Sequence, residues 1–109
     1  MLVKEFELNL TKAKTICQSF IHEINNNGFK SKQVLLRSYT RNTFDAIFLI
    51  DENDYLNDDF LRIYNLGQKI QKEQRNDNFN ISFSFMPDSK KINEKKLIID
   101  GYVLKYLIK

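Results

Sequence analysis

The first third of the chain contains two patterns of hydrophobic residues. Leu2, Phe6 and Leu8 alternate with a second set of residues (Val3, Glu5 and Glu7), so residues 2–9 are predicted to form a half-buried strand. Hydrophobic residues then recur at the spacing of one helix face, and Gly28 suits the left-handed position that ends a helix. The residues of this face are Ala13, Ile16, Cys17, Phe20 and Ile24. A strand followed by an amphipathic helix is therefore expected.

Two hydrophobic runs follow, over residues 33–39 and 44–50, with a polar turn at residues 40–43 between them. The second run is almost entirely hydrophobic, which is typical of a strand buried on both faces in the middle of a sheet. Asn42 tolerates the positive φ that a tight turn can require. These residues predict a hairpin whose second strand is central.

Helical spacing returns over residues 56–76, and Asn57-Asp58-Asp59 opens this second helix. Carboxylates in a first helical turn contribute about 0.3–1 kcal/mol each, because they complement the helix dipole. Hydrophobic residues then alternate with serines over residues 81–85, which predicts a strand with one wet face, and Pro87 closes it. The predicted core consists of Ile16, Phe20, Ile24, Phe48, Ile50, Phe60, Ile63, Ile70, Phe83 and Phe85.

The tail, residues 92–109, fits two structures. Asp100-Gly101 between two hydrophobic triplets is a hairpin signal, whereas Asn93-Glu94-Lys95-Lys96 resembles the first turn of a helix that Gly101 would cap. A helix followed by a strand is the preferred interpretation. The predicted order is therefore β-α-β-β-α-β with a C-terminal helix/strand appendage. It describes a single α+β domain over residues 1–109, a two-layer sandwich with its helices on one face of the sheet.

Composition supports a packed domain in a reducing compartment. The chain is 42% hydrophobic and 13% aromatic, which is enough for a core. Cys17 is the single cysteine, no leader pattern begins the chain, and no hydrophobic run reaches the roughly 20 residues that span a bilayer. A cytoplasmic protein is expected. The many Asn, Lys, Ile and Phe residues are typical of an AT-rich coding sequence, as found in microbes, phages and plasmids.

The net charge of the chain is small, but its acidic and basic residues are concentrated in different segments. Seventeen basic and fourteen acidic residues leave a net charge of +3. An acidic block without an intervening base consists of Asp51, Glu52, Asp54, Asp58 and Asp59. The basic residues of the C-terminal part are Lys90, Lys91, Lys95, Lys96, Lys105 and Lys109. Such asymmetry is compatible with a surface for a charged partner and also with solvated faces that keep the protein in solution.

Most chemistry-bearing patterns are missing. The chain has one histidine, His22, and Cys17 lies on a hydrophobic helix face, so neither a metal site nor thiol catalysis is expected. Its three glycines are too far apart to form a phosphate-binding loop. The acidic block lacks the glycine and glutamate that a calcium loop requires, because Leu56 and Arg62 occupy those positions. No metal or cofactor is therefore expected.

The segment Leu36–Asp45, LRSYTRNTFD, resembles the signature of small nucleotidyltransferase-fold proteins. The resemblance extends weakly over residues 11–106. In that family a Gly-Ser pair binds the nucleotide phosphates, and two aspartates on the next strand hold divalent metal. The positions that agree are Ser38, Tyr39, Arg41, Thr43 and Asp45. The resemblance therefore implies a nucleotide site around Ser38 and Asp45.

Three departures from this signature bear on activity. Arg37 replaces the glycine that lets the backbone approach phosphate, and Ile47 replaces the second metal-binding aspartate. The spacer between Thr43 and Asp45 is also shorter than the family usually has. One carboxylate cannot hold two hard cations, since each needs several oxygen ligands. The resemblance therefore implies a catalytically impaired domain.

The sequence favours a non-enzymatic binding or regulatory domain, of the antitoxin or inhibitor kind, that acts on a macromolecular partner, most simply a protein. The expected surface joins the hairpin turn to the acidic block. Its residues are Arg37, Ser38, Arg41, Asp45, Asp51, Asp54, Asp58 and Asp59. The alternative is a nucleic-acid-binding module with a ferredoxin-like sheet, in which Tyr39 and Phe83 or Phe85 stack on bases while Arg37 and Arg41 contact phosphates.

Overall fold

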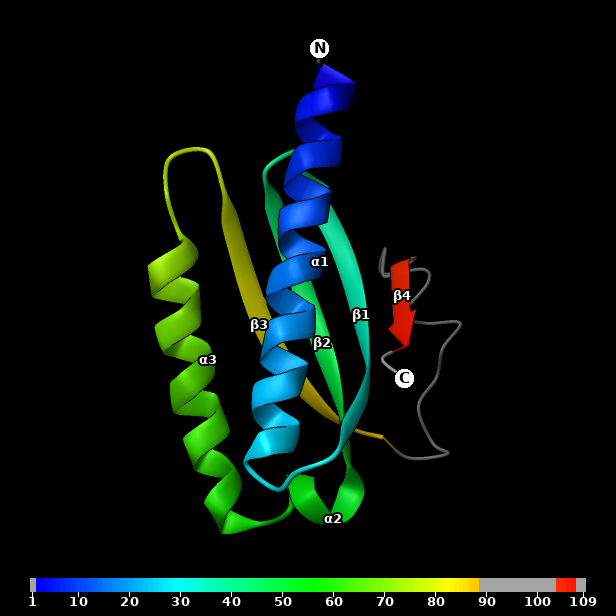
Figure 1. Ribbon diagram of the computed structural model, residues 1–109, viewed down its shortest axis with the longest axis vertical. Coiled ribbons are helices and arrows are strands. Elements are labelled where there is room, and N and C mark those ends of the chain that lie inside the picture. The colour runs from blue at the N-terminus through cyan, green and yellow to red at the C-terminus, as the bar shows by residue number, and fades with distance from the viewer. Residues whose placement is uncertain (1, 89–103, 108–109) are drawn as a thin grey trace.

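The computed structural model describes the backbone of residues 2–88 and 104–107 and the side chains of residues 5–31 and 33–87 (Figure 1). Its elements are α1 (Leu2–Asn26), β1 (Ser31–Thr40), β2 (Thr43–Asp51), α2 (Glu52–Tyr55), the 3-10 helix η1 (Asp58–Phe60), α3 (Leu61–Gln74), β3 (Asn80–Asp88) and β4 (Leu104–Leu107). Within the described residues, no helix is long and apolar enough to cross a membrane.

The strands form one mixed sheet in the order β3-β2-β1-β4. β1 and β2 are an antiparallel hairpin, and β3 returns parallel to β2 after α2, η1 and α3. β4 pairs antiparallel with residues 33–36 of β1. Helices α1 and α3 lie on the same face of this sheet (Figure 1), so the α+β class and the two-layer arrangement are confirmed.

The predicted first strand is wrong, because residues 2–9 belong to α1. The hydrophobic positions that suggested alternation also fit helical spacing, and Phe6 continues the buried face through Leu10 to Ala13. The ring of Phe6 stacks on that of Phe44 in β2, with 6.2 Å between centroids. This contact stabilises an unbroken helix, so the described order is α-β-β-α-β followed by β4.

The predicted second helix, residues 56–76, is confirmed as η1 continuing into α3, and the short helix α2 that precedes it was not predicted. Asp51 accepts a hydrogen bond from the backbone N–H of Asn53 at 3.1 Å and caps α2, and Asn57 accepts one from Asp59 at 2.9 Å and caps η1. Asp and Asn side chains bond readily to nearby backbone N–H groups, so the two caps begin two separate helical stretches. The residues between β3 and β4 lie outside the described part. The predicted choice between a helix and a hairpin over residues 92–103 lies outside it as well.

The core between the helices and the sheet is centred on aromatic rings. Phe20 of α1 is fully buried, and its ring centroid lies 5.0 Å from that of Phe48 and 4.9 Å from that of Phe83. At Gly67 of α3, an added Cβ would lie 3.1 Å from the Phe20 ring, so glycine permits this close packing. The predicted core is confirmed, with Ile70, Phe83 and Phe85 partly buried at its margin.

The sheet is also covered on the face away from α1 and α3. Leu35 of β1 and Ile47 and Leu49 of β2 are buried there, and Met86 of β3 packs against them. On the helical face, β2 contributes Phe44, Ala46, Phe48 and Ile50, all of which are fully buried. The prediction that the second strand of the hairpin is buried on both faces is therefore confirmed.

Candidate functional site

The structure divides the expected surface into two parts. The hairpin turn follows β1, whereas the acidic block begins at Asp51, the last residue of β2. The nine residues of β2 separate the two parts by roughly 25 Å, at about 3.3 Å per residue. Figure 1 shows the β1–β2 turn and helix α2 at opposite ends of the sheet. The predicted residues therefore form two separate candidate sites.

The first candidate is an ion pair on the sheet face away from the helices. Arg37 of β1 lies directly opposite Asp45 of β2 in the sheet register, and Arg37 Nη2 lies 2.8 Å from Asp45 Oδ2. The guanidinium also lies 4.1 Å from the centre of the Tyr39 ring and donates a hydrogen bond to the Tyr39 hydroxyl. About a fifth of each charged side chain is exposed. Arg37, Tyr39 and Asp45 thus form a group across β1 and β2 in which the two charged side chains pair on a partly buried sheet face.

Burial raises the pKa of Asp45 above its usual value near 3.8, and the positive charge of Arg37 opposes this rise. The Asp45 carboxylate is already paired with the Arg37 guanidinium. Ser38, the expected phosphate contact, donates its hydroxyl hydrogen bond to the backbone oxygen of Thr40 at 2.7 Å. Within the described residues, no group of three histidine, cysteine or acidic side chains is placed to hold a metal ion. The ion pair joins β1 and β2.

Arg41 at the hairpin turn contacts α1. Its Nε lies 3.7 Å from a carboxylate oxygen of Glu5, and its backbone oxygen accepts a hydrogen bond from Asn9 at 3.0 Å. Both charged side chains are about half exposed, so their ion pair adds little stability. Its role in the structure is to tie the turn to the first part of α1.

The expected base-stacking platform is absent from the exposed part of β3. Phe83 and Phe85 point into the helical layer, where their ring centroids lie 4.9 and 5.9 Å from that of Phe20. Both rings are partly buried against the core, as the predicted core has them, and serines occupy the alternate positions of this strand, so their placement does not favour the alternative role in base stacking. Tyr39 is 57% exposed, but the Arg37 guanidinium lies over its ring. One occupied ring is a poor platform for nucleic acid.

The second candidate surface begins with the acidic block. Two of its carboxylates support local structure, since Asp51 caps α2 and Asp54 accepts a hydrogen bond from the backbone N–H of Lys30 at 2.7 Å. None of the ion pairs found among the described residues involves the acidic block. The carboxylates of this block that are exposed are those of Glu52, Asp58 and Asp59.

Exposed hydrophobic side chains accompany these acids. Leu56 is 72% exposed, Leu61 64% and Tyr64 38%. Leu61 and Tyr64 are three residues apart in α3 and therefore share a face of that helix. We call residues 51–64, which combine this hydrophobic surface with the acidic block, the acidic end. Its hydrophobic part was not predicted from the sequence. The signal for it is the position of Leu61, which lies outside the buried face formed by Phe60, Ile63 and Gly67.

The rings beneath this surface hold Tyr64 in place. The Tyr64 ring centroid lies 5.4 Å from that of Phe60 and 4.8 Å from that of Phe85. Partial burial raises the pKa of Tyr64, and the neighbouring Tyr55 raises it further. Tyr64 therefore remains neutral at physiological pH, and the charge at the acidic end comes from its carboxylates. Tyr64 supplies a rigid aromatic surface beside them.

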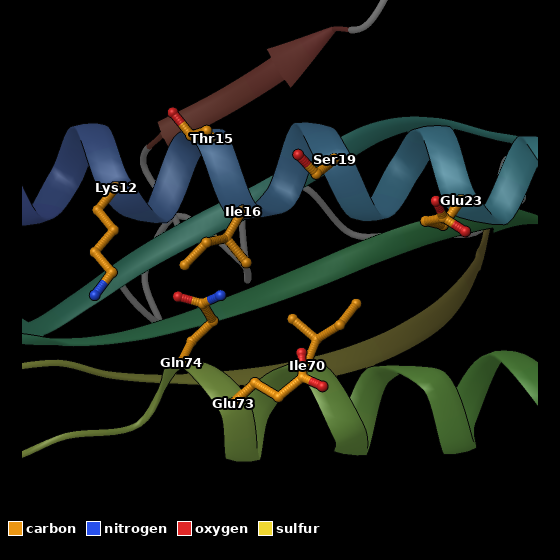
Figure 2. Close-up of a pocket in the computed structure, with 8 residues that line it drawn as sticks. All are labelled: Lys12, Thr15, Ile16, Ser19, Glu23, Ile70, Glu73 and Gln74. Carbon is orange, nitrogen blue, oxygen red and sulfur yellow. The ribbon is translucent and has the colours of Figure 1, made fainter.

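A groove of about 400 Å³ lies between α1 and α3 (Figure 2). Ile16 and Ile70 point into it from the two helices, and the Lys12 ammonium lies 4.4 Å from the centre of the Phe79 ring at one end. Glu23 is at the other end, so the charged groups are spread along the groove instead of converging on one point. The remaining lining residues are Thr15, Ser19, Glu73 and Gln74. This arrangement defines no ligand chemistry.

Comparisons with known proteins add no relative. No protein-family model matches the chain, and neither a curated protein nor a solved structure is similar to it. The function of the chain is therefore inferred from the surfaces described above.

Proposed function

We propose that this chain is a non-enzymatic binding domain, and that it docks a protein partner through the acidic end. One observation carries the proposal: three of the five large hydrophobic side chains that are exposed in the described part lie at residues 56–64, directly after or within the acidic block. The other two, Leu8 and Tyr39, lie on α1 and β1. Exposed hydrophobic groups gathered beside polar ones are typical of protein-interaction surfaces.

The physical basis is the removal of hydrophobic area from water. Burying apolar surface contributes roughly 25 cal/mol per Å², and large side chains such as tyrosine supply much of the affinity at protein interfaces. Tyr64 is held by the rings below it, so little side-chain entropy is lost when a partner covers it. The carboxylates of Asp58 and Asp59 are placed to guide a partner of opposite charge.

A binding role also suits the rest of the described molecule. Asp45 is engaged by Arg37, and the position of a second family carboxylate is the buried Ile47, which supports an impaired rather than an active nucleotidyltransferase-like domain. A cytoplasmic location is part of the proposal, because the lone thiol of Cys17 is buried in the core and requires no disulfide partner.

The test is capture of the native partner from a lysate of the source cells, with the tagged full chain as bait. The double variant Leu56→Ser/Leu61→Ser should lose the partner captured by the unchanged chain, whereas Leu8→Ser should retain it. Leu8 is a matched control, because it is 65% exposed but lies on α1. Circular dichroism should show that all three proteins fold. Equal capture by the folded double variant would contradict the proposal.

A further inference from the structure

We infer that the acidic end recognises a basic segment of its partner in which lysine or arginine side chains alternate with large hydrophobic ones. The inference depends on the proposed function and adds the chemistry of the partner. It follows from two properties of one surface among the described residues: carboxylates that take part in none of the ion pairs found there, and exposed hydrophobic side chains.

The charge at this end is strongly one-sided. The acidic block contributes five carboxylates, whereas the described basic residues beside it are Lys30 and Arg62. Arg62 donates a hydrogen bond to the backbone oxygen of Asp59, and its guanidinium lies 5.9 Å from the centre of the Phe29 ring, so it is directed partly toward backbone and ring. A partner that docks here therefore meets an excess of negative charge.

The hydrophobic and acidic positions are interleaved along the chain. Leu56 precedes Asp58 and Asp59, and Leu61 and Tyr64 follow them. A segment that complements this surface therefore places its cations beside the carboxylates and its hydrophobic side chains beside the exposed leucines and Tyr64. The stems of lysine and arginine can themselves cover hydrophobic surface while their charged groups reach the carboxylates. A basic and apolar segment satisfies both requirements.

Charge argues against the other occupants. A second copy that docks through the same surface would bring two acidic blocks together, and like charges oppose such contacts. Nucleic acid and anionic lipid surfaces carry the same sign as the acidic end, so neither gains the counterion release or electrostatic attraction that drives their binding to proteins. A basic protein segment is the occupant that the surface favours.

Three labelled peptides of equal length, titrated with the full chain and followed by fluorescence anisotropy, test this inference. The basic–apolar peptide arranges lysine and leucine in an amphipathic pattern, the second peptide has glutamate in place of lysine, and the third has serine in place of leucine. The basic–apolar peptide should bind at least about 10-fold more tightly than the other two at low ionic strength, where surface charges are screened least. Equal binding of the glutamate peptide, or no binding of any peptide at about 1 mM, would overturn the inference.

Matched charge variants locate the effect. Asp58→Asn/Asp59→Asn should weaken binding of the basic–apolar peptide about 3- to 10-fold, since each exposed charge pair contributes modestly. Glu7→Gln/Asp77→Asn removes the same charge from exposed positions elsewhere and should change the affinity less than about 2-fold. Equal weakening by both variants would mean that net charge alone is responsible and would overturn the inference.

Failure of this inference and failure of the proposed function give different results. If native-partner capture is lost with Leu56→Ser/Leu61→Ser but the Asp58→Asn/Asp59→Asn variant behaves normally, the docking surface stands and the basic character of the partner is wrong. Sedimentation velocity of the chain alone should give a monomer. Concentration-dependent association that Asp58→Asn/Asp59→Asn abolishes would assign the surface to a second copy and overturn the inference.

Discussion

Replacement of Phe48 by alanine tests the architecture that positions both candidate sites. Phe48 lies in the middle of β2 and is fully buried. Its ring centroid lies 5.0 Å from that of Phe20, 5.1 Å from that of Phe83 and 5.8 Å from that of Phe85. The change removes a ring that joins α1, β2 and β3.

The expected loss is about 3–5 kcal/mol in the free energy of unfolding, because truncating a buried phenylalanine removes transfer free energy and leaves a cavity. That loss is a large fraction of the roughly 5–15 kcal/mol that stabilises a typical domain. Urea denaturation followed by circular dichroism should show a midpoint at least about 1 M lower, given slopes of roughly 1–3 kcal/mol per M.

Leu56→Ala is the matched control, since Leu56 is 72% exposed. A surface change of this kind should alter the free energy of unfolding by no more than about 0.5 kcal/mol. A Phe48→Ala midpoint equal to that of the unchanged protein would mean that β2 is not the buried centre of the sheet, and the reasoning that separates the hairpin from the acidic end would fail with it.

Three other predictions concern titration and ligand binding. The carboxyl pKa of Asp45, measured by ¹³C NMR, should lie above 3.8, and Arg37→Met should raise it further, because the guanidinium is the group that lowers it; an unchanged or lower value in the variant would refute this assignment. Since the folded-state pKa of Asp45 is raised, its contribution to stability is fully present below about pH 3.8 and is lost as the pH rises through the folded-state value. Burial raises the pKa of the Cys17 thiol to about 12, so native protein should react with a thiol reagent at pH 8 far more slowly than urea-unfolded protein, and equal rates would contradict the buried position. Calorimetric titration with Mg-ATP should show no micromolar binding, and no nucleotidyl transfer should be detectable, because Arg37 and Ile47 replace the glycine and the second aspartate of the family signature.

The strands of the hairpin were predictable because their hydrophobic runs are interrupted by a polar turn at the correct distance. Burial of β2 on both faces was also evident from its almost continuous hydrophobic composition. The helical state of residues 2–9 was not predictable, since hydrophobic residues at positions 2, 6 and 8 fit both a strand and a helix over so short a range. Contacts between distant segments, such as the stacking of Phe6 on Phe44, distinguish the two.

The candidate site was predictable in its residues but not in its arrangement. The acidic block is obvious in the sequence, and two of its members cap or brace local structure as Asp residues commonly do. Its separation from the hairpin turn follows from the length of β2, and the strand predicted over residues 44–50 already implied it, although the expected surface joined the two ends. Leu56 follows α2 and Leu61 begins α3, and their exposure depends on how these helices pack, which hydrophobic spacing alone does not predict.

The acidic end is the surface that we propose a basic protein partner contacts. Titration of ¹⁵N-labelled full chain with the basic–apolar peptide, followed by NMR, tests this assignment residue by residue. We expect the amide signals of residues 51–64 to shift as the peptide is added, while those of Arg37 to Asp45 keep their positions. Shifts at Arg37 to Asp45 without any at residues 51–64 would refute the assignment and place the binding surface at the opposite end of the sheet.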